Sequence, residues 1–384
     1  MNDFPSTGYE RGKIFAKTGV KVGMNYARHY LKKLQNKEAS QSELHTETAR
    51  QVFGEFTKLR GTALKLAQTL SIDQGFLPDE FAEVMTQAQY KVPPVNRSLV
   101  RSIIKRELGG YPEQLFKTFD PEAFAAASIG QVHRATLHDG TAVAVKVQYP
   151  GVRDTISSDV GLASALFKRF VSDKAAVDEY INEVRDTLMR ETDYLVEGAS
   201  IEQFHARFAS DTIVTPRWIE ERSTERVLCM TFIEGEHLGD FLERHPEQEE
   251  RDLYGQLLWD FFHRQLATPE FIHADTHPGN FLLTPDGALG VIDYGCVKSF
   301  PKPFFDDYLR LLPTHLENDE EKILALYKRL DILKGDPSAN KKEKEYFEFC
   351  KNYGLTFAMP YMEDAFDFGS AEYKTLLKGY TKNA

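Results

Sequence analysis

The chain has 384 residues, of which 42% are hydrophobic and 12% aromatic, a globular composition with enough length for two domains or one two-lobed unit. Its net charge of −11 argues against broad nucleic-acid binding, so we expect no nucleic acid among its partners. Three widely spaced cysteines, no apolar run of eighteen residues and no apolar N-terminal stretch predict a reducing, cytoplasmic location, without a transmembrane helix or a secretory signal.

Residues 11–37 are the chain's basic segment. They carry eight Lys or Arg and no acid, and Met24, Ala27, Leu31 and Leu34 form a helical apolar stripe among them. Such a helix either packs its stripe on the protein body, which is the commoner case, or lies on an anionic membrane surface. The second alternative would make the protein peripheral on a membrane.

The next stretch of the chain is predicted to be helical. One apolar face consists of Phe56, Leu59, Ala63, Leu66 and Leu70. Lys65 and Gln68 lie three residues apart on another face of the same helix, and from the residues alone this is a solvated face. A further helix is expected over 99–108, where Gly109 and Gly110 would end it.

From about Phe116 the apolar residues alternate as they do in strands. Strands are predicted at Gln131–Leu137 and Ala142–Gln148, joined by the turn 138–140. They are followed by predicted helices at Val152–Phe170 and Ala175–Ala209 and by predicted strands at Ile213–Glu220 and Arg226–Ile233. This order predicts an α+β, protein-kinase-like fold with a small antiparallel sheet lobe at 113–235, a helical lobe at 236–384 and an N-terminal helical extension at 1–112.

Lys146 ends the alternating strand Val143–Lys146, as does the kinase lysine that contacts the α- and β-phosphates of ATP. The preceding segment matches the kinase Gly-x-Gly-x-x-Gly-x-Val pattern, with alanine at the first two glycine positions. Its candidate nucleotide-binding residues are Ala125, Ala126, Ala127, Ser128, Ile129, Gly130 and Val132. Because alanine restricts φ, we expect a stiffer loop that holds the nucleotide differently.

Two further parts of a nucleotide site are predicted. Glu191 is the chosen acid partner of Lys146, with Glu183 and Glu197 as alternatives on the same predicted helix. The strand that ends near Ile233 is read as the hinge between the lobes. Main-chain groups of Thr231 and Ile233 would bind adenine, and Met230 would back the pocket, although a plain core strand would have the same residues.

The segment from Asp275 to Asp293 predicts the chemistry. Asp275, Asn280 five residues later, a short hairpin and Asp293-Tyr-Gly form the catalytic pattern of kinase-like phosphotransferases. The predicted strands Phe281–Thr284 and Ala288–Ile292 would return Asp293 to the side of Asn280. Amide and carboxylate oxygens suit Mg²⁺, so Asn280 and Asp293 are the predicted metal ligands on ATP, and Asp275 would orient the attacking oxygen.

Two other interpretations of this segment are weaker. His273 and His277 have the spacing of a zinc pair, but Pro278 disfavours a helix there and no Glu follows the first His. Asp275 and Asp293 taken singly would be ordinary loop acids. Both at this spacing, on either side of a predicted hairpin, favour the phosphotransferase interpretation.

From about Lys58 to Phe300 the chain resembles the UbiB-type, ADCK-like family of atypical kinases. The resemblance rests on Ala125–Val132, Val143–Gly151, Glu191–Tyr194 and Phe271–Phe281, together with Lys65-Leu-Ala-Gln68, which is similar to the family's Lys-x-Gly-Gln signature. Ala67 replaces the signature glycine, and no Ala-Pro-Glu segment follows Gly295.

The resemblance implies that Lys65 and Gln68 point into the active site from a helical extension laid across it. It also implies binding of ATP or ADP, ATP hydrolysis, and a role in ubiquinone or related prenyl-lipid biosynthesis. The expected substrate is therefore a small or lipid-like molecule or water, with a biosynthetic protein complex as a partner. Two alternatives stay open: an ATP- or ADP-sensing scaffold with little catalysis, and an aminoglycoside-type small-molecule phosphotransferase.

Overall fold

The computed structural model describes residues 95–127, 129–168, 174–268 and 271–381, together with Lys13, Lys17, Lys21, Met24, Asn25, Leu44 and residues 46–51. The predicted Lys65 and Gln68 signature, Ser128 and most of the basic segment 11–37 lie outside the described residues. Contacts divide the chain into two compact units. One comprises the described residues before Leu258 and Asp275–Cys296, and the other comprises Leu258–Ala274 and the chain from Val297 onward.

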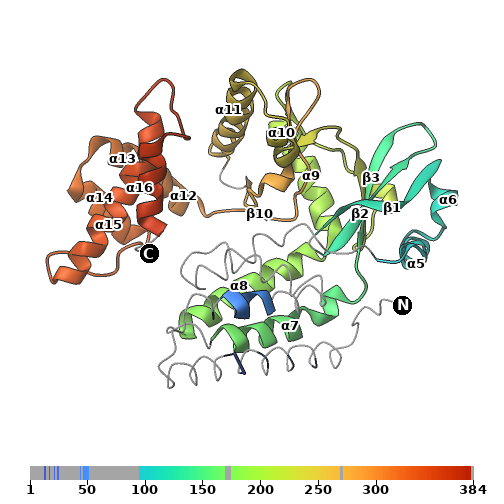
Figure 1. Cartoon of the computed structure of the whole chain (residues 1–384), viewed down its shortest axis with the longest axis horizontal. Helices are drawn as coiled ribbons and strands as arrows, with labels where there is room; N and C mark the ends of the chain where they lie inside the picture. Colours follow the sequence, from blue (N-terminus) through green and yellow to red (C-terminus); the bar gives the residue numbers. More distant parts are fainter. Residues whose placement is uncertain are drawn as a thin grey trace. The chain divides into compact units, whose positions relative to one another are not determined.

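An antiparallel sheet of four strands in the order β1-β2-β3-β5 organises the first unit (Figure 1). Its strands are β1 (Thr118–Ala126), β2 (Gly130–Thr136), β3 (Ala142–Gln148) and β5 (Val227–Thr231). Both predicted strands of the β2–β3 hairpin are confirmed, and Gly140 in their turn has a φ of 96°, which favours glycine. Strand β1 was not predicted. It contains Pro121 and is irregularly paired, as befits an edge strand.

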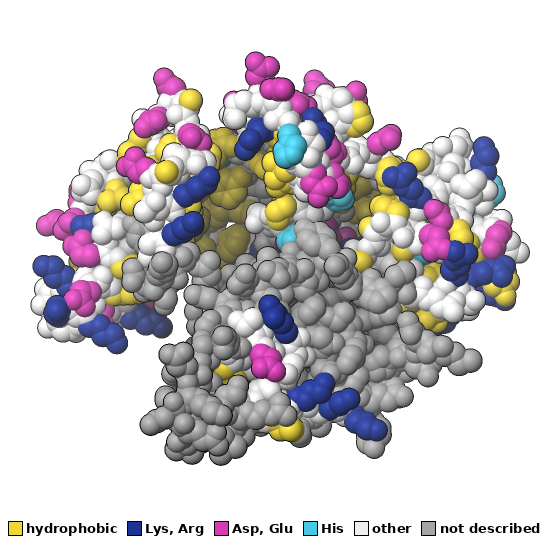
Figure 2. All heavy atoms as spheres, in the orientation of Figure 1, with side chains coloured by type: hydrophobic (Ala, Val, Ile, Leu, Met, Phe, Trp, Pro, Cys, Tyr) yellow, Lys and Arg dark blue, Asp and Glu magenta, His cyan; other side chains and the backbone are white. Residues whose placement is uncertain are grey.

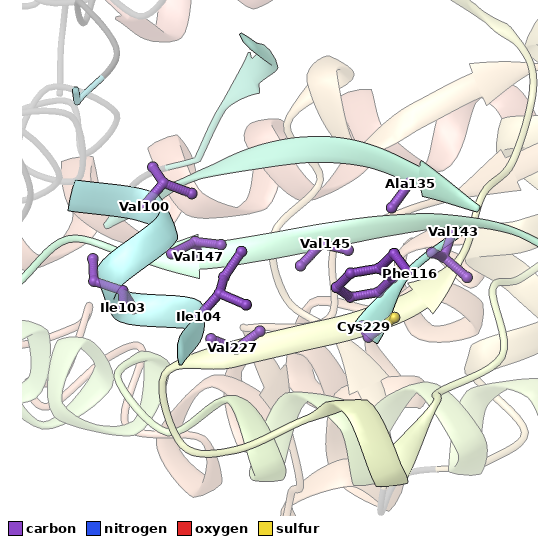
Figure 3. Close-up of a cluster of buried hydrophobic side chains, with 10 residues drawn as sticks. All are labelled: Val100, Ile103, Ile104, Phe116, Ala135, Val143, Val145, Val147, Val227 and Cys229. Atoms are coloured by element: carbon purple, nitrogen blue, oxygen red, sulfur yellow. The ribbon is translucent and has the colours of Figure 1, made fainter. Parts of the chain in front are cut away.

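One face of this sheet is covered by helix α5 (Arg97–Leu108), which the sequence predicted and which ends at Gly109 in the left-handed conformation. Figure 3 shows Val100, Ile103 and Ile104 of α5 packed toward the sheet. The sheet residues of this core are Val143, Val145 and Val147 of β3, Val227 and Cys229 of β5, and Ala135 of β2, with Phe116 beside them. Because side chains alternate along a strand, Ala144 and Lys146 point to the opposite face.

The predicted helix Ala175–Ala209 is wrong in one respect, because the structure has two helices there. Helix α8 (Lys174–Glu191) ends before Asp193, and α9 (Tyr194–Phe208) begins after it. The Asp193 carboxylate accepts the Leu195 N–H at 3.1 Å and so caps α9. Helix α7 (Val152–Phe167) packs along α8, and α6 (Pro112–Leu115) joins α5 to β1.

A second sheet in this unit carries the predicted catalytic hairpin. Its order is β4-β9-β8-β6, with β4 (Ile213–Val214), β9 (Leu289–Val291), β8 (Phe281–Leu283) and β6 (Glu236–His237). Gly287 turns the β8–β9 hairpin with a φ of 78°, which confirms the predicted turn. The predicted strand Ile213–Glu220 is mostly wrong, since only two of its residues form a strand; Pro216 has no N–H to donate to a ladder.

The remaining elements are mainly helical. They are α10 (Leu238–Glu243), α11 (Gln248–Gln265), α12 (Lys302–Leu309), α13 (Leu311–Glu317), α14 (Glu320–Arg329), α15 (Lys341–Ala358) and α16 (Ala371–Thr381), the strand pair β7 (Ile272–His273) and β10 (Val297–Lys298), and the 3-10 turns η1 (Glu220–Arg222), η2 (Pro278–Asn280) and η3 (Met359–Tyr361). In the second unit, Ile323, Tyr327, Leu333 and Phe347 form a buried core.

The surface carries interspersed charges of both signs, and acidic side chains gather over α10 and α11 in Figure 2. Among the described residues, no helix combines the length and the apolar character needed to cross a bilayer.

A tight contact between α9 and the segment before η1 yields a stability prediction. A Cβ added to Gly198 would lie 2.3 Å from Cε2 of Trp218, whereas a Cβ added to Gly255 of α11 would meet no atom within 4 Å. We expect Gly198→Ala to lower the free energy of unfolding by about 1–3 kcal/mol through overpacking. Gly255→Ala should raise it by about 0.5–1 kcal/mol because alanine favours the helix.

Urea unfolding followed by circular dichroism measures both changes. Equal effects of the two substitutions would show that helix propensity alone governs Gly198 and would contradict the packing argument.

Candidate active site

A small polar pocket in the first unit gathers most of the predicted catalytic residues. Its lining consists of Ile129, Lys146, Glu191, Glu197, Asp275, Asp293, Gly295 and Cys296. Lys146 comes from β3, Glu197 from the first turn of α9, Glu191 from the end of α8, and the two aspartates from the segments that follow β7 and β9. Four carboxylates and one ammonium group therefore line the same pocket, and this excess of negative charge favours a cation there.

The partner of Lys146 is Glu197. Its Nζ lies 2.9 Å from Oε1 and 3.0 Å from Oε2 of Glu197, and both side chains are buried. The predicted pairing of Lys146 with Glu191 is therefore wrong, and the alternative Glu197 is correct. The break at Asp193 is the physical reason: it starts a new helix whose first turn presents Glu197 to β3, while Glu191 remains at the end of α8 as a lining residue.

Asp293 forms the second carboxylate contact of Lys146, with Oδ2 3.5 Å from Nζ. Burial lowers the pKa of Lys146, but the negative charges of Asp293 and Glu197 outweigh this and hold the pKa well above its ordinary value. Burial, together with the charge of Asp293, raises the pKa of Glu197 to about 7 despite the attraction of Lys146. The ring of Tyr194 lies 5.1 Å from Nζ and completes the enclosure of the ammonium group.

The alanine-rich segment forms a strand end and a tight turn. Ala125 and Ala126 lie in β1, paired with Val132 and Gln131, so the prediction that they belong to a loop is wrong. The Ala127 N–H donates to the Gly130 carbonyl at 2.9 Å, and the Gly130 N–H donates back at 3.4 Å. These two N–H groups are thus bonded within the turn rather than directed outward.

Gly130 is sterically required at the end of this turn. A Cβ on this residue would lie 2.5 Å from the Val147 carbonyl oxygen and 2.8 Å from the Tyr194 hydroxyl. Of the other predicted nucleotide-binding residues, Ile129 lines the pocket, and Val132 lies opposite Lys146 in the sheet. The turn therefore packs closely against Val147 of β3 and Tyr194 of α9.

The predicted hinge is only partly as expected. Met230 is buried and lies opposite Ala144 on the pocket face of the sheet. The Thr231 N–H donates to the Arg217 carbonyl at 2.9 Å, so of the main-chain groups of Thr231 predicted to bind adenine this one already has an acceptor. Ile233 follows β5 and stays a predicted adenine contact.

The β8–β9 hairpin has the predicted geometry. The Ile292 N–H donates to the Asn280 carbonyl at 3.1 Å, which places Asp293 next to Asn280. The Asn280 Nδ2 donates to the Asp275 carbonyl at 3.1 Å, so its Oδ1 lies on the other side of the amide. Asp275 and Asp293 line the pocket, whereas Asn280 adjoins it through Asp275. Asp293 Oδ1 accepts the Gly295 N–H at 2.9 Å.

The donor set fits Mg²⁺ better than zinc. In the part of the chain that the structure describes, no three or more His, Cys, Asp or Glu side chains are placed to hold a metal ion by themselves. Mg²⁺ commonly takes one or two protein oxygens and completes its shell with phosphate and water. His277 instead uses Nδ1 to accept the Gly279 N–H at 3.0 Å, which argues against the zinc pair with His273.

Sequence reasoning missed Cys296 of the pocket lining, and it quoted Gly295 and Tyr194 only as parts of motifs, without a role at the site. The place of Cys296 next to the Asp293-Tyr-Gly pattern is a usable signal for it. The Thr192-Asp193 pair was a signal for the helix break, because Asp is a preferred N-cap residue.

The raised pKa of Glu197 predicts a pH dependence of stability. The ordinary pKa of this carboxyl group is 4.5. Between pH 4.5 and about pH 7, Glu197 is therefore protonated in the folded protein and ionised in the unfolded chain. The contribution of Glu197 to stability is therefore fully present below about 4.5 and falls as the pH rises to about 7. In EDTA, the parent should therefore lose roughly 1–3 kcal/mol of unfolding free energy relative to Glu197→Gln as the pH rises from 5 to 8.

Chemical unfolding of both proteins at each pH measures this difference. Titrations common to both cancel, so parallel stability curves would show that Glu197 keeps an ordinary pKa.

Comparison with known proteins agrees with this geometry. The family model described as "ABC1 atypical kinase-like domain" matches residues 87–327. The chain is 29% identical over 364 residues to "Probable serine/threonine-protein kinase abkA" of Dictyostelium discoideum, covering 89% of this chain and 64% of that protein. It is 28% identical over 340 residues to "Atypical kinase COQ8, mitochondrial" of Saccharomyces cerevisiae, covering 85% of this chain and 66% of that protein.

The chain thus spans slightly less than two thirds of the length of each of these curated relatives. Among solved structures, it is similar to Rv3197 of Mycobacterium tuberculosis, whose structure is described as a complex with erythromycin. The TM-score is 0.62 at 28% identity, over 88% of this chain and 84% of that one. The chain therefore belongs to the ABC1 family of atypical kinases, also called the UbiB family, and has a kinase-like phosphotransferase fold.

Proposed function

We propose that this protein binds Mg²⁺-ATP in the pocket around Lys146 and uses it as an atypical kinase or ATPase. The observation that carries the proposal is the buried Lys146–Glu197 ion pair with Asp293 3.5 Å from the same ammonium group. A buried lysine with two carboxylates has a fixed position and a permanent positive charge, which suits contact with phosphate oxygens.

Asn280 and Asp293 would hold Mg²⁺, which would neutralise charge on the phosphates of ATP. Lys146 would contact the α- and β-phosphates, kept in place by Glu197. Asp275, whose Oδ1 accepts the His277 N–H at 3.3 Å, would orient the acceptor oxygen and receive its proton. The γ-phosphoryl group would pass from ATP to that oxygen as its bond to the β-phosphate oxygen breaks and ADP leaves, so that ATP and water, for example, give ADP and phosphate.

The acceptor class is proposed from similarity. The family resemblance supports a role in ubiquinone or related prenyl-lipid biosynthesis, with a small or lipid-like substrate or water and a biosynthetic protein complex as partner. Rv3197 is described in complex with erythromycin, which supports including small organic molecules among the acceptors tested. Lys65 and Gln68 would close the site, as the resemblance implies, and residues 11–37 would contact an anionic membrane, the less common of the two alternatives that the sequence left open.

One observation favours a second candidate function, a nucleotide-sensing scaffold with little catalysis. The N–H groups of Ala127 and Gly130 each donate to the main-chain carbonyl of the other residue, although they belong to the segment that in kinases offers N–H groups to phosphates. Binding through Lys146 and Asp293 would survive this arrangement, whereas the positioning of the γ-phosphate would be weaker.

The test is Mg²⁺-dependent ATP hydrolysis by the parent and by Asp293→Asn, with and without anionic liposomes. We expect the substitution to lower kcat by at least about 100-fold, because it removes a metal-binding charge. Asp286→Asn is the matched control, since it removes the same charge from the exposed turn of the same hairpin and should leave turnover unchanged.

Stimulation by liposomes would support the membrane contact. Thermal stabilisation of the parent by nucleotide without any product would instead favour the scaffold. The absence of both ATP turnover and thermal stabilisation by nucleotide would refute the nucleotide site.

A further inference from the structure

Helix α9, which carries Glu197, is fastened at a second point along its length. Glu202, five residues after Glu197, binds Arg217 with both oxygens: Nη2 lies 2.9 Å from Oε2, and Nε lies 3.1 Å from Oε1. The same Oε1 accepts the Trp218 N–H at 2.8 Å. The Arg217 guanidinium lowers the pKa of Glu202, so this pair is ionised at neutral pH. We call Glu202, Arg217 and Trp218 the α9 latch.

The other side of the latch is joined to strand β5. The Arg217 N–H donates to Thr231 Oγ1 at 2.8 Å, and the Thr231 N–H donates to the Arg217 carbonyl at 2.9 Å. Trp218 also forms a β-bridge with Met230. Since β5 is hydrogen-bonded to β3, the strand of Lys146, the latch links the helix of Glu197 back to the sheet that carries its partner.

The latch also fixes the rotation of α9. The indole of Trp218 occupies the space beside Gly198, where a Cβ would lie 2.5 Å from Nε1, and Gly198 and Glu202 are four residues apart on one helix face. With a rise of about 1.5 Å per residue, these contacts begin within one residue of Glu197 and end about 7.5 Å along the axis. A shift of α9 away from β3 would therefore break them.

We propose that Glu202 is a positioning residue for the nucleotide site: through Arg217 and Trp218 it holds α9 so that Glu197 keeps Lys146 in the orientation that contacts phosphate. This inference rests on the proposed function. It adds that the Lys146–Glu197 pair is assembled before the nucleotide binds, because the contacts of the α9 latch already hold the helix in place.

The size of the change in nucleotide affinity, compared with the change in stability, separates a positioning role of Glu202 from a merely structural one. An exposed ion pair contributes little to stability, and a pair that only braced the helix would leave nucleotide affinity almost unchanged. The matched control is Glu250, which binds Arg244 in the same two-oxygen manner, at 2.7 and 3.1 Å, away from the pocket lining.

The experiment compares Glu202→Ala with Glu250→Ala by calorimetric titration with Mg²⁺-ADP and by urea unfolding. Both should lose similar, small stability. Glu202→Ala should weaken nucleotide binding about threefold to tenfold, and Glu250→Ala should not. Glu202→Gln keeps an acceptor for the Trp218 N–H and should restore part of the affinity.

A double-substitution cycle tests the route. If Glu202 acts through Glu197, then Glu202→Ala should weaken binding no further once Glu197→Ala is present. Equal affinities of Glu202→Ala and Glu250→Ala, or full additivity with Glu197→Ala, would overturn the inference while leaving the nucleotide site intact. A parent protein that binds no nucleotide would overturn both.

Discussion

The buried ion pair between Lys146 and Glu197 is the interaction on which the site depends. Removing an ammonium group and a carboxylate from water costs several kcal/mol each, so such a pair persists only where its geometry is fixed and further polar contacts are supplied. Here Glu197 offers both oxygens, Asp293 offers a third, and the ring of Tyr194 faces the ammonium group. Three elements distant in sequence must meet to make it: β3, α9 and the end of β9.

The surrounding architecture follows from that requirement. The hydrophobic core beneath α5 holds β3 in the middle of its sheet, with Val143, Val145 and Val147 on one face and Lys146 on the other. The second sheet returns the chain to Asp293 through the β8–β9 hairpin. The net excess of carboxylates that results is a fitting environment for a divalent cation bound to an anionic nucleotide, and this connects the fold to the proposed chemistry.

Parts of this site are encoded locally, and these the sequence predicted. The β2–β3 and β8–β9 hairpins have glycine at positive φ in their turns, so their strands, Lys146 and the placement of Asp293 beside Asn280 followed from short-range patterns. The partner of Lys146 did not follow from such patterns. The choice among Glu183, Glu191 and Glu197 depends on where the helix breaks and on how the two resulting helices pack. The bond of the Thr231 N–H was not predictable for a similar reason, since its acceptor, the Arg217 carbonyl, lies fourteen residues earlier on an irregular segment. Ala125 and Ala126 have little strand preference, and β1 forms through pairing with β2.

The contact of Trp218 with Gly198 has a practical consequence. The chain has two tryptophans, and one lies in each compact unit: Trp218 in the first and Trp259 in the second. The buried indole nitrogen of Trp218 is adjacent to the helix that carries Glu197. With Trp259 replaced by phenylalanine, intrinsic fluorescence would come from a single indole beside α9, and its emission would report movements of that helix without any attached dye.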